Sequence, residues 1–349
     1  MLSLETLTEA CSDLGAPHYR AVQVYEALTR RFVRSFDEVA GLPRDLRAAL
    51  ADRLSMVSLA EADRSVSADG RTRKALLVTD DGAAIEAVLL LSASRATVCV
   101  STQVGCAVRC AFCASGADGL RRDLTAEEIV EQVLHFAREL REQVKRVTNV
   151  VFMGMGEPFF NYDETLRACR MLNDPAGFGL AARGISVSTA GVVPAITRFM
   201  GEPMQLNLAV SLHAATDELR EQLVPLNRRY PLDTLFAACK DYVTATRRKL
   251  FFEWVLLSGV NDGPDQIAAL RKRFDQPLYH LNVIGYNETG GAFRRPAPRD
   301  LAAFREQIVS VGIACTMRRS TGSEIAAACG QLTLHEKSAA NMQERSPGQ

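Results

Sequence analysis

Three cysteines stand close together about a third of the way along the chain. They are Cys106, Cys110 and Cys113, which form a Cys-x3-Cys-x2-Cys pattern. Because thiolates are soft ligands, this spacing predicts a loop that binds three irons of a [4Fe–4S] cluster. The fourth iron would have no cysteine and could bind a substrate-like ligand, which is a catalytic arrangement. A structural zinc site is the alternative, but it would need a fourth ligand, and such sites usually repeat a Cys-x2-Cys pair.

The elements that must hold this loop begin at about residue 95. From there, apolar β-type runs alternate with amphipathic stretches such as 127–140 and 267–274. Strands that are each followed by a helix predict a parallel sheet with helices outside, which can curl into a complete or partial barrel. The predicted strands are 97–100, 147–153, 185–188, 206–211, 250–257 and 279–284.

The rest of the chain divides into shorter parts. Residues 1–60 carry apolar side chains at helical spacing, which predicts a helical module. Residues 61–94 contain two strand-like runs around Asp80-Asp81-Gly82, which predicts a β-hairpin or small sheet. We therefore expect an α/β protein with a partial barrel of six β/α units over 95–335, the helical module and the β extension. A polar, mobile tail is expected over 336–349.

Small and polar residues follow several of the predicted strands. Residues 154–158 (Gly-Met-Gly-Glu-Pro) follow the second strand, Ser188 ends the third, Ser211 ends the fourth, and Asn287 follows the last. Because active sites of α/β barrels lie at the carboxyl ends of the strands, these residues should gather around the cysteine loop. Taken singly, each polar side chain is explained equally well as a buried group that caps a loop.

The cysteine motif, with Phe112 before its third cysteine, resembles that of the radical S-adenosylmethionine (SAM) enzymes. In that superfamily SAM binds the open iron, and the reduced cluster cleaves it to a 5′-deoxyadenosyl radical. Residues 17–332 further resemble the RlmN/Cfr methyltransferases, which methylate an adenosine of large-subunit ribosomal RNA. This resemblance implies a SAM site made of Gly156, Glu157, Ser188, Ser211, Leu212, His213 and Asn287.

The same resemblance gives roles to three further residues. From the residues alone, Cys99 and Cys329 are small packed thiols, and Glu86 belongs to an exposed strand face. The resemblance implies that Cys329 takes a methyl group from one SAM and that a second SAM generates the radical that activates it. It also implies that Cys99 resolves the enzyme–RNA adduct through a disulfide and that Glu86 is the proton acceptor. The cysteines that match nothing in the family are predicted to pack as apolar groups: Cys11, Cys169, Cys239 and Cys315.

Composition limits the partners and the location. The chain has 349 residues with 41 basic and 41 acidic side chains, so its formal net charge is zero. This excludes a protein whose whole surface is basic and coats nucleic acid. Any contacts with RNA phosphates must therefore come from local basic patches. Our candidates are Arg121-Arg122 and Arg318-Arg319. No apolar run reaches about 18 residues, so no transmembrane helix is expected. The first residues include an acidic side chain where a secretory signal would have basic ones. We therefore expect a cytoplasmic protein without membrane association.

Four functions remain open on the sequence. We favour methylation of carbon 2 of an adenosine in ribosomal RNA, and also in transfer RNA, by a monomer that draws electrons from flavodoxin or ferredoxin. The second is Cfr-like methylation of carbon 8. A relative with a non-RNA substrate is disfavoured because the helical module resembles an RNA-contacting domain. A metal-stabilised RNA-binding module without catalysis is disfavoured because Cys99 and Cys329 are both present.

Overall fold

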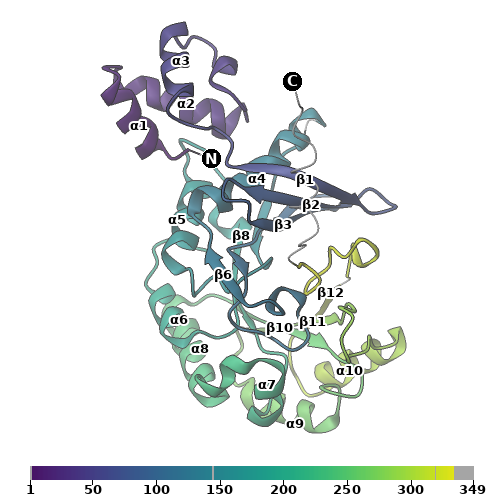
Figure 1. Cartoon of the computed structure of the whole chain (residues 1–349). Coiled ribbons are helices and arrows are strands. Elements are labelled where there is room, and N and C mark those ends of the chain that lie inside the picture. Colours follow the sequence, from purple (N-terminus) through teal and green to yellow (C-terminus); the bar gives the residue numbers. More distant parts are fainter. Residues whose placement is uncertain (1, 144, 319, 334–349) are drawn as a thin grey trace.

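One large sheet organises the molecule (Figure 1). The computed structural model describes residues 2–143, 145–318 and 320–333, so the tail predicted over 336–349 lies outside the described residues. The sheet has ten strands in the order β1-β2-β3-β4-β7-β8-β9-β10-β11-β12, and its two edges, β1 and β12, do not pair with each other. The α/β class and the open, partial barrel are therefore confirmed.

The parallel part of the sheet contains every strand predicted from residue 95 onward. Each neighbouring pair from β4 to β12 is parallel. The last strand, β12, was not predicted, because it is only four residues long and alternates half-buried with exposed positions. The strands are β4 (Ala96–Cys99), β7 (Asn149–Phe152), β8 (Ile185–Thr189), β9 (Asn207–Ser211), β10 (Leu250–Leu256), β11 (Tyr279–Gly285) and β12 (Cys315–Arg318).

Helices cover the outer face of the curved sheet (Figure 1). The first of them begins with a capping box between Thr125 and Glu128, which satisfies backbone N–H groups at the helix start. Among the described residues, no helix combines the length and apolarity needed to cross a bilayer. The helices are α4 (Ala126–Glu142), α5 (Tyr162–Asn173), α6 (Val193–Met200), α7 (Asp217–Leu223), α8 (Leu232–Thr246), α9 (Pro264–Arg273) and α10 (Pro298–Ser310).

An antiparallel extension continues the sheet beyond β4. It contains β1 (Leu59–Val66), β2 (Thr72–Thr79) and β3 (Ala84–Leu91), and β3 pairs antiparallel with β4. The predicted small sheet is present, but its first strand was missed because most of its residues are exposed and polar. Two further short strands, β5 (Gln103–Gly105) and β6 (Leu120–Asp123), form a separate ribbon.

The N-terminal residues form the predicted helical module, which lies at one end of the molecule (Figure 1). Its side chains tie it to the barrel, since Arg30 donates from Nη2 to Pro175 O at 2.5 Å and the Phe32 and Phe178 rings lie 5.9 Å apart. The module contains α1 (Leu4–Asp13), α2 (His18–Arg30), η1 (Phe36–Glu38) and α3 (Arg44–Ala51). The other short 3-10 helices are η2 (Ala114–Gly116), η3 (Ala182–Gly184), η4 (Pro225–Arg228) and η5 (Ser323–Ile325).

Candidate active site

The cysteine loop is closed by a tight approach between two short strands. It connects β5 with β6, and Cys106 donates its backbone N–H to Gly119 O at 2.9 Å. Gly105 has a φ of +81°, and a Cβ there would lie 1.9 Å from Gly119 O, so the closure requires glycine. Ala111 donates its N–H to Leu223 O at 3.0 Å, which fixes the loop on α7.

A cavity of about 150 Å³ gathers most of the residues predicted for the site. It lies where β7, β8 and β9 end, as expected for a barrel-type sheet. A second cavity of about 360 Å³ shares part of its wall with the first and contains Asn287. Leu212 is buried and belongs to neither wall. The wall of the first cavity includes Cys106, Cys110, Cys113, Gly156, Glu157, Ser188, Ser211 and His213.

The three loop thiols fit the ligand set of an iron–sulfur cluster. Burial raises the pKa of Cys106 to about 12 and also raises the pKa values of Cys110 and Cys113. Such thiols become thiolates when metal cations compensate their charge, so the loop is suited to metal binding. In the described ranges, no three His, Cys, Asp or Glu side chains form a group able to hold a metal ion as they stand. The fit therefore rests on the three thiols sharing one cavity wall and on their soft-ligand chemistry.

A glycine turn after β7 lies beside the cysteines in this cavity. Gly156 has a φ of +100°, and a Cβ there would lie 2.7 Å from Gln103 Cβ. Glu157 is buried, and its carboxylate accepts the N–H of Ala190 at 2.6 Å and that of Phe159 at 3.0 Å. Burial nevertheless raises the pKa of Glu157 to about 7, so a cation placed in the cavity would favour its ionised form.

His213 is held as a neutral imidazole at the end of β9. It has a φ of +60°, and its Nδ1 accepts the N–H of Val255 at 3.0 Å. Its ring meets the edge of the Phe112 ring, with the centroids 4.7 Å apart. Burial, and then the positive charge of Arg220, lower the pKa of His213 to about 3. The neutral ring therefore carries its proton on Nε2, where it can donate to a ligand.

Sequence analysis missed Arg220, a fully buried residue of α7. Its guanidinium donates to Leu212 O at 3.1 Å, to Ala190 O at 2.7 Å and to Ser211 O at 3.1 Å. These bonds join the ends of β8 and β9, and the positive charge opposes the rise in the pKa of Cys110 that burial causes. Arg220 was overlooked because it stands in a short, highly charged segment that suggests a solvated helix face.

The two cysteines predicted to act on the methyl group differ in which cavities they line. Cys329 lines both cavities, whereas Cys99, at the end of β4, lines only the larger one. Cys329 is exposed to solvent, but the protein atoms around its thiol raise the pKa of that thiol. The negative charge of Glu253 raises this pKa further, and Arg318 opposes the rise. The cysteines without a predicted role are buried or half-buried: Cys11, Cys169, Cys239 and Cys315.

The predicted proton acceptor, Glu86, contacts the segment that carries Cys329. It does not line either cavity. It is almost fully buried on β3. Its Oε1 lies 2.7 Å from Lys74 Nζ, and its Oε2 accepts the N–H of Thr333 at 2.9 Å. The alternative of an exposed strand face is therefore wrong for this residue, and its carboxylate is paired inside the protein.

Glu253 is a second residue that sequence analysis missed. It is buried on β10 and lies in the wall of the cavity that contains the three loop cysteines. Its Oε1 accepts from Asn282 Nδ2 at 2.9 Å and lies 3.5 Å from Arg318 Nη2, while its Oε2 has no hydrogen-bond partner among the described residues. Burial raises the pKa of Glu253. The available signal was a lone carboxylate within the apolar run 250–257.

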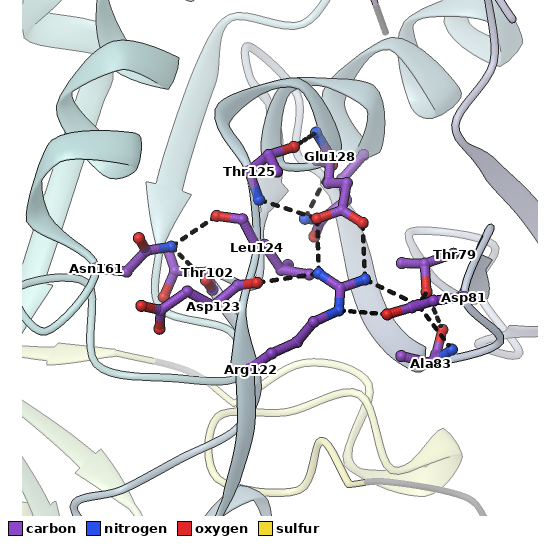
Figure 2. A network of polar contacts seen from close by, with 11 residues as sticks. Thr79, Asp81, Ala83, Thr102, Arg122, Asp123, Leu124, Thr125, Glu128 and Asn161 are labelled. Carbon is purple, nitrogen blue, oxygen red and sulfur yellow. Dashed lines mark hydrogen bonds and ion pairs between the residues drawn. The ribbon is translucent and has the colours of Figure 1, made fainter.

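Arg122, one of the predicted phosphate contacts, is already ion-paired with carboxylates of the protein, as Figure 2 shows. Arg122 Nε lies 2.7 Å from Asp81 Oδ2, and its Nη2 lies 2.8 Å from Glu128 Oε1. These ion pairs join the turn between β2 and β3 to the start of α4. We therefore do not retain Arg122 as a phosphate contact. Of the other predicted pair, Arg319 lies outside the described residues.

Comparisons with known proteins identify the family of the chain. The model of the radical SAM superfamily matches residues 100–271, which contain the cysteine loop and the ends of β7, β8, β9 and β10. A probable dual-specificity RNA methyltransferase RlmN from Chloroflexus aurantiacus is 44% identical over 342 residues, covering 95% of this chain and 91% of the relative. The chain belongs to the RlmN family of radical SAM methyltransferases.

Further RlmN relatives and a solved structure support the assignment. The dual-specificity RNA methyltransferase RlmN from Syntrophobacter fumaroxidans is 43% identical, covering 95% of this chain and 96% of the relative. The crystal structure of a radical SAM methyltransferase from Sphaerobacter thermophilus superposes with a TM-score of 0.92 at 47% identity, covering 95% of this chain and 97% of that one. The likeness to the RlmN family therefore includes the helical module and the β extension as well as the barrel.

Proposed function

We propose that this RlmN-family enzyme methylates carbon 2 of an adenosine in large-subunit ribosomal RNA, and also in transfer RNA, through an S-methylcysteine on Cys329. The observation that carries the proposal is the position of Cys329 in the shared wall of two cavities. On one side lie the loop cysteines and five of the predicted SAM residues, Gly156, Glu157, Ser188, Ser211 and His213; on the other lie Cys99 and a sixth predicted SAM residue, Asn287. A side chain in this position can receive a methyl group in one cavity and deliver it in the other.

The residues present fit a [4Fe–4S] cluster and SAM. Cys106, Cys110 and Cys113 would hold three irons, and the predicted SAM residues that surround them would hold the nucleoside and the methionine portion. The bound cluster and SAM supply the electron and the hydrogen-abstracting radical that an electron-poor aromatic carbon requires. The neutral His213 would donate to the ligand from Nε2, and Glu157 would be ionised by a neighbouring cation.

The chain's own thiols would carry the methyl group. The Cys329 thiolate attacks the methyl carbon of a first SAM, forming a sulfur–carbon bond while the sulfonium bond breaks and S-adenosylhomocysteine leaves. After one hydrogen atom is removed from this S-methyl group, its carbon adds to carbon 2 of the adenine and joins enzyme to RNA; the adduct radical would then lose one electron, for which the bound cluster would be the acceptor. Cys99 helps to remove the proton from carbon 2 and then attacks the sulfur of Cys329. The bond between that sulfur and the methyl carbon breaks as the disulfide forms, and the released carbon takes up a proton to become the product methyl group. A reductant restores both thiols.

Glu86 is proposed as a proton acceptor close to the base, on the resemblance to the RlmN/Cfr family. Its carboxylate is bonded to Lys74 and to the Thr333 N–H, so it must give up the Thr333 bond to meet a base. We also propose that the enzyme is a cytoplasmic monomer and that flavodoxin or ferredoxin supplies its electrons. These last assignments rest on the same resemblance.

Mass spectrometry of nucleosides tests the proposed activity. Reconstituted enzyme is incubated without oxygen with SAM, reductant and either unmodified large-subunit ribosomal RNA or transfer RNA. We expect 2-methyladenosine from the intact enzyme and none from Cys329→Ala, while Cys315→Ala, a half-buried cysteine without a proposed role, behaves like the intact enzyme. Formation of 8-methyladenosine instead would establish the Cfr-like activity. SAM cleavage without any methylated adenosine would contradict an RNA substrate.

A further inference from the structure

The antiparallel extension forms a platform for the segment that carries Cys329. We define this segment, residues 322–333, as the Cys329 loop. Thr72 and Lys74 are two residues apart on β2, so their side chains point to the same face of the sheet. Both meet the loop: Lys74 Nζ donates to Ala326 O at 3.1 Å, and a Cβ on Gly322 would lie 2.5 Å from Thr72 Cγ2. The loop and β2 are therefore in close contact at two points.

Lys74 is placed to hold the loop in two ways. Its side chain is buried, and its Nζ lies 2.7 Å from Glu86 Oε1 as well as bonding to Ala326 O. Glu86 in turn accepts the Thr333 N–H at 2.9 Å, so the ion pair reaches the loop at both Ala326 and Thr333. Cys329 lies between these two anchors. A buried ion pair is costly to desolvate unless further hydrogen bonds satisfy it, and here the loop backbone supplies them.

The backbone of the loop is shaped to reach this lysine. Ala326 has a φ of +51°, which is uncommon for a residue with a Cβ, and Gly322 has a φ of +75°. The Ala327 N–H returns to Gly322 O at 2.8 Å, which closes a tight turn between them. This turn presents the Ala326 carbonyl to Lys74, so the strained conformation is supported by the contact that it makes.

Two other elements hold the loop on its remaining sides. The Ala114 N–H donates to Gly330 O at 2.8 Å, and Ser115 Oγ donates to Leu332 O at 2.6 Å, both from the residues that follow the last loop cysteine. Asn287 Nδ2 donates to Cys329 O at 3.3 Å. On the side of the loop that faces β2 and β3, the contacts come from Lys74, Glu86 and Thr72.

We propose that Lys74 is a positioning residue that, through Glu86 and Ala326 O, holds the Cys329 loop so that the thiol stands between the two cavities. Lys74 lines neither cavity and acts through the loop. The functional part of this inference rests on the proposed function, in which Cys329 carries the methyl group. The structural part, anchoring of the loop, can be measured without any turnover.

Amide hydrogen exchange of the loop tests the anchoring. In Lys74→Met we expect the amides of residues 326–333 to exchange at least about tenfold faster, because hydrogen bonds to a charged group are lost. The strands β8 and β9 should keep their protection. Arg73→Met is the matched control, since Arg73 is the next residue of β2, points to the opposite face and pairs with Glu139 of α4. Unchanged exchange of the loop in Lys74→Met would overturn the proposal.

A second variant covers the case in which Lys74→Met does not fold because Glu86 stays buried without the positive charge of Lys74. Lys74→Met/Glu86→Leu removes both charges, and apolar replacement of a buried ion pair is often neutral or stabilising. We expect this variant to be folded but to show the same faster exchange over residues 326–333. A folded double variant with a fully protected loop would also overturn the proposal.

The rate at which Cys329 becomes methylated distinguishes a failure of the positioning role from a failure of the proposed function. Enzyme incubated with SAM is digested, and the peptide that contains Cys329 is weighed. We expect slower methylation of Cys329 in Lys74→Met than in Arg73→Met, with partial recovery in Lys74→Arg, which keeps the charge. A loop that exchanges faster in Lys74→Met while Cys329 is methylated at the control rate would refute positioning. Absence of methyl in every form, the intact enzyme included, would count against the proposed function alone.

Discussion

Cys329 and Cys99 line the same cavity, but only Cys329 also reaches the cavity of the three loop cysteines. The two thiols also differ in exposure, since Cys99 is buried and Cys329 is exposed. The difference in the cavities that they line gives Cys329 access to the predicted SAM site and leaves Cys99 facing the space where a base would lie. The arrangement supports one thiol that carries the methyl group and another that acts only after transfer.

Replacing Cys99 should stop the reaction after the methyl carbon has joined the RNA. Cys99→Ala leaves Cys329 able to accept and deliver the methyl group, but it removes the thiol that releases the product. We therefore expect a covalent protein–RNA adduct, detected as a slowly migrating band on a denaturing gel. Free 2-methyladenosine from Cys99→Ala at the rate of the intact enzyme would contradict this role.

The charge of Glu253 should control the reactivity of Cys329. Protein atoms around the thiol raise its pKa, and Glu253 raises it further. Glu253→Gln removes the negative charge, so the pKa of Cys329 should fall and more thiolate should be present at any pH below it. A fall of one unit would make alkylation about tenfold faster in that range. Alkylation of the Cys329 peptide is followed by mass spectrometry from pH 6 to 10.

Arg318 provides the control of opposite sign for that measurement. Its positive charge lowers the pKa of Cys329, so Arg318→Met should shift the alkylation profile toward higher pH. Profiles that move in the same direction for Glu253→Gln and Arg318→Met would mean that altered packing, not charge, sets the reactivity.

Arg220 should contribute strongly to stability. Its guanidinium donates to backbone carbonyls at the ends of β8 and β9, and Arg220→Met would remove this charged donor from all three of these buried acceptors. We expect a loss of at least about 3 kcal/mol in the free energy of unfolding. Urea unfolding of the anaerobic protein measures it. Arg228→Met is the control, because the exposed Arg228–Glu221 pair should contribute less than about 1 kcal/mol.

Gly156 should not tolerate a side chain. A Cβ in Gly156→Ala would lie 2.7 Å from Gln103 Cβ, and the φ of +100° disfavours any residue other than glycine. We expect the free energy of unfolding to fall by about 2 to 4 kcal/mol. We also expect weaker binding of SAM, and calorimetry measures both effects. Gly291→Ala is the control, since no atom lies within 4 Å of the added Cβ and the φ of Gly291 lies outside the left-handed region that disfavours other residues. Equal SAM affinity and stability in both variants would contradict the argument.

Local patterns made much of the fold and site predictable. Apolar runs separated by amphipathic stretches predicted six strands of the parallel sheet, β4 and β7 to β11, and the cysteine spacing predicted the loop. What failed depends on contacts between distant segments. Strand β12 is short and only half-buried, and it exists because β11 offers a free edge. Arg220 looks like a surface residue in the sequence, and its burial follows from the packing of α7 against two strand ends.

Lys74 shows the same limit within the site. Its type and position in a strand give no hint of a partner more than 200 residues later, because the contact with Ala326 depends on the whole sheet being formed. The roles of Cys99, Cys329 and Glu86 came from the family resemblance. The structure adds that the two thiols border one cavity, while Glu86 belongs to the support of the Cys329 loop.

The path of the methyl hydrogens tests the central claim most directly. The enzyme is supplied with SAM whose methyl group carries three deuterium atoms, and the methylated adenosine and 5′-deoxyadenosine are weighed. If the methyl group passes through Cys329 and loses one hydrogen before it joins the base, the product methyl should retain two deuterium atoms and the third should appear in 5′-deoxyadenosine. A product that retains all three would show direct transfer of an intact methyl group and would contradict the account.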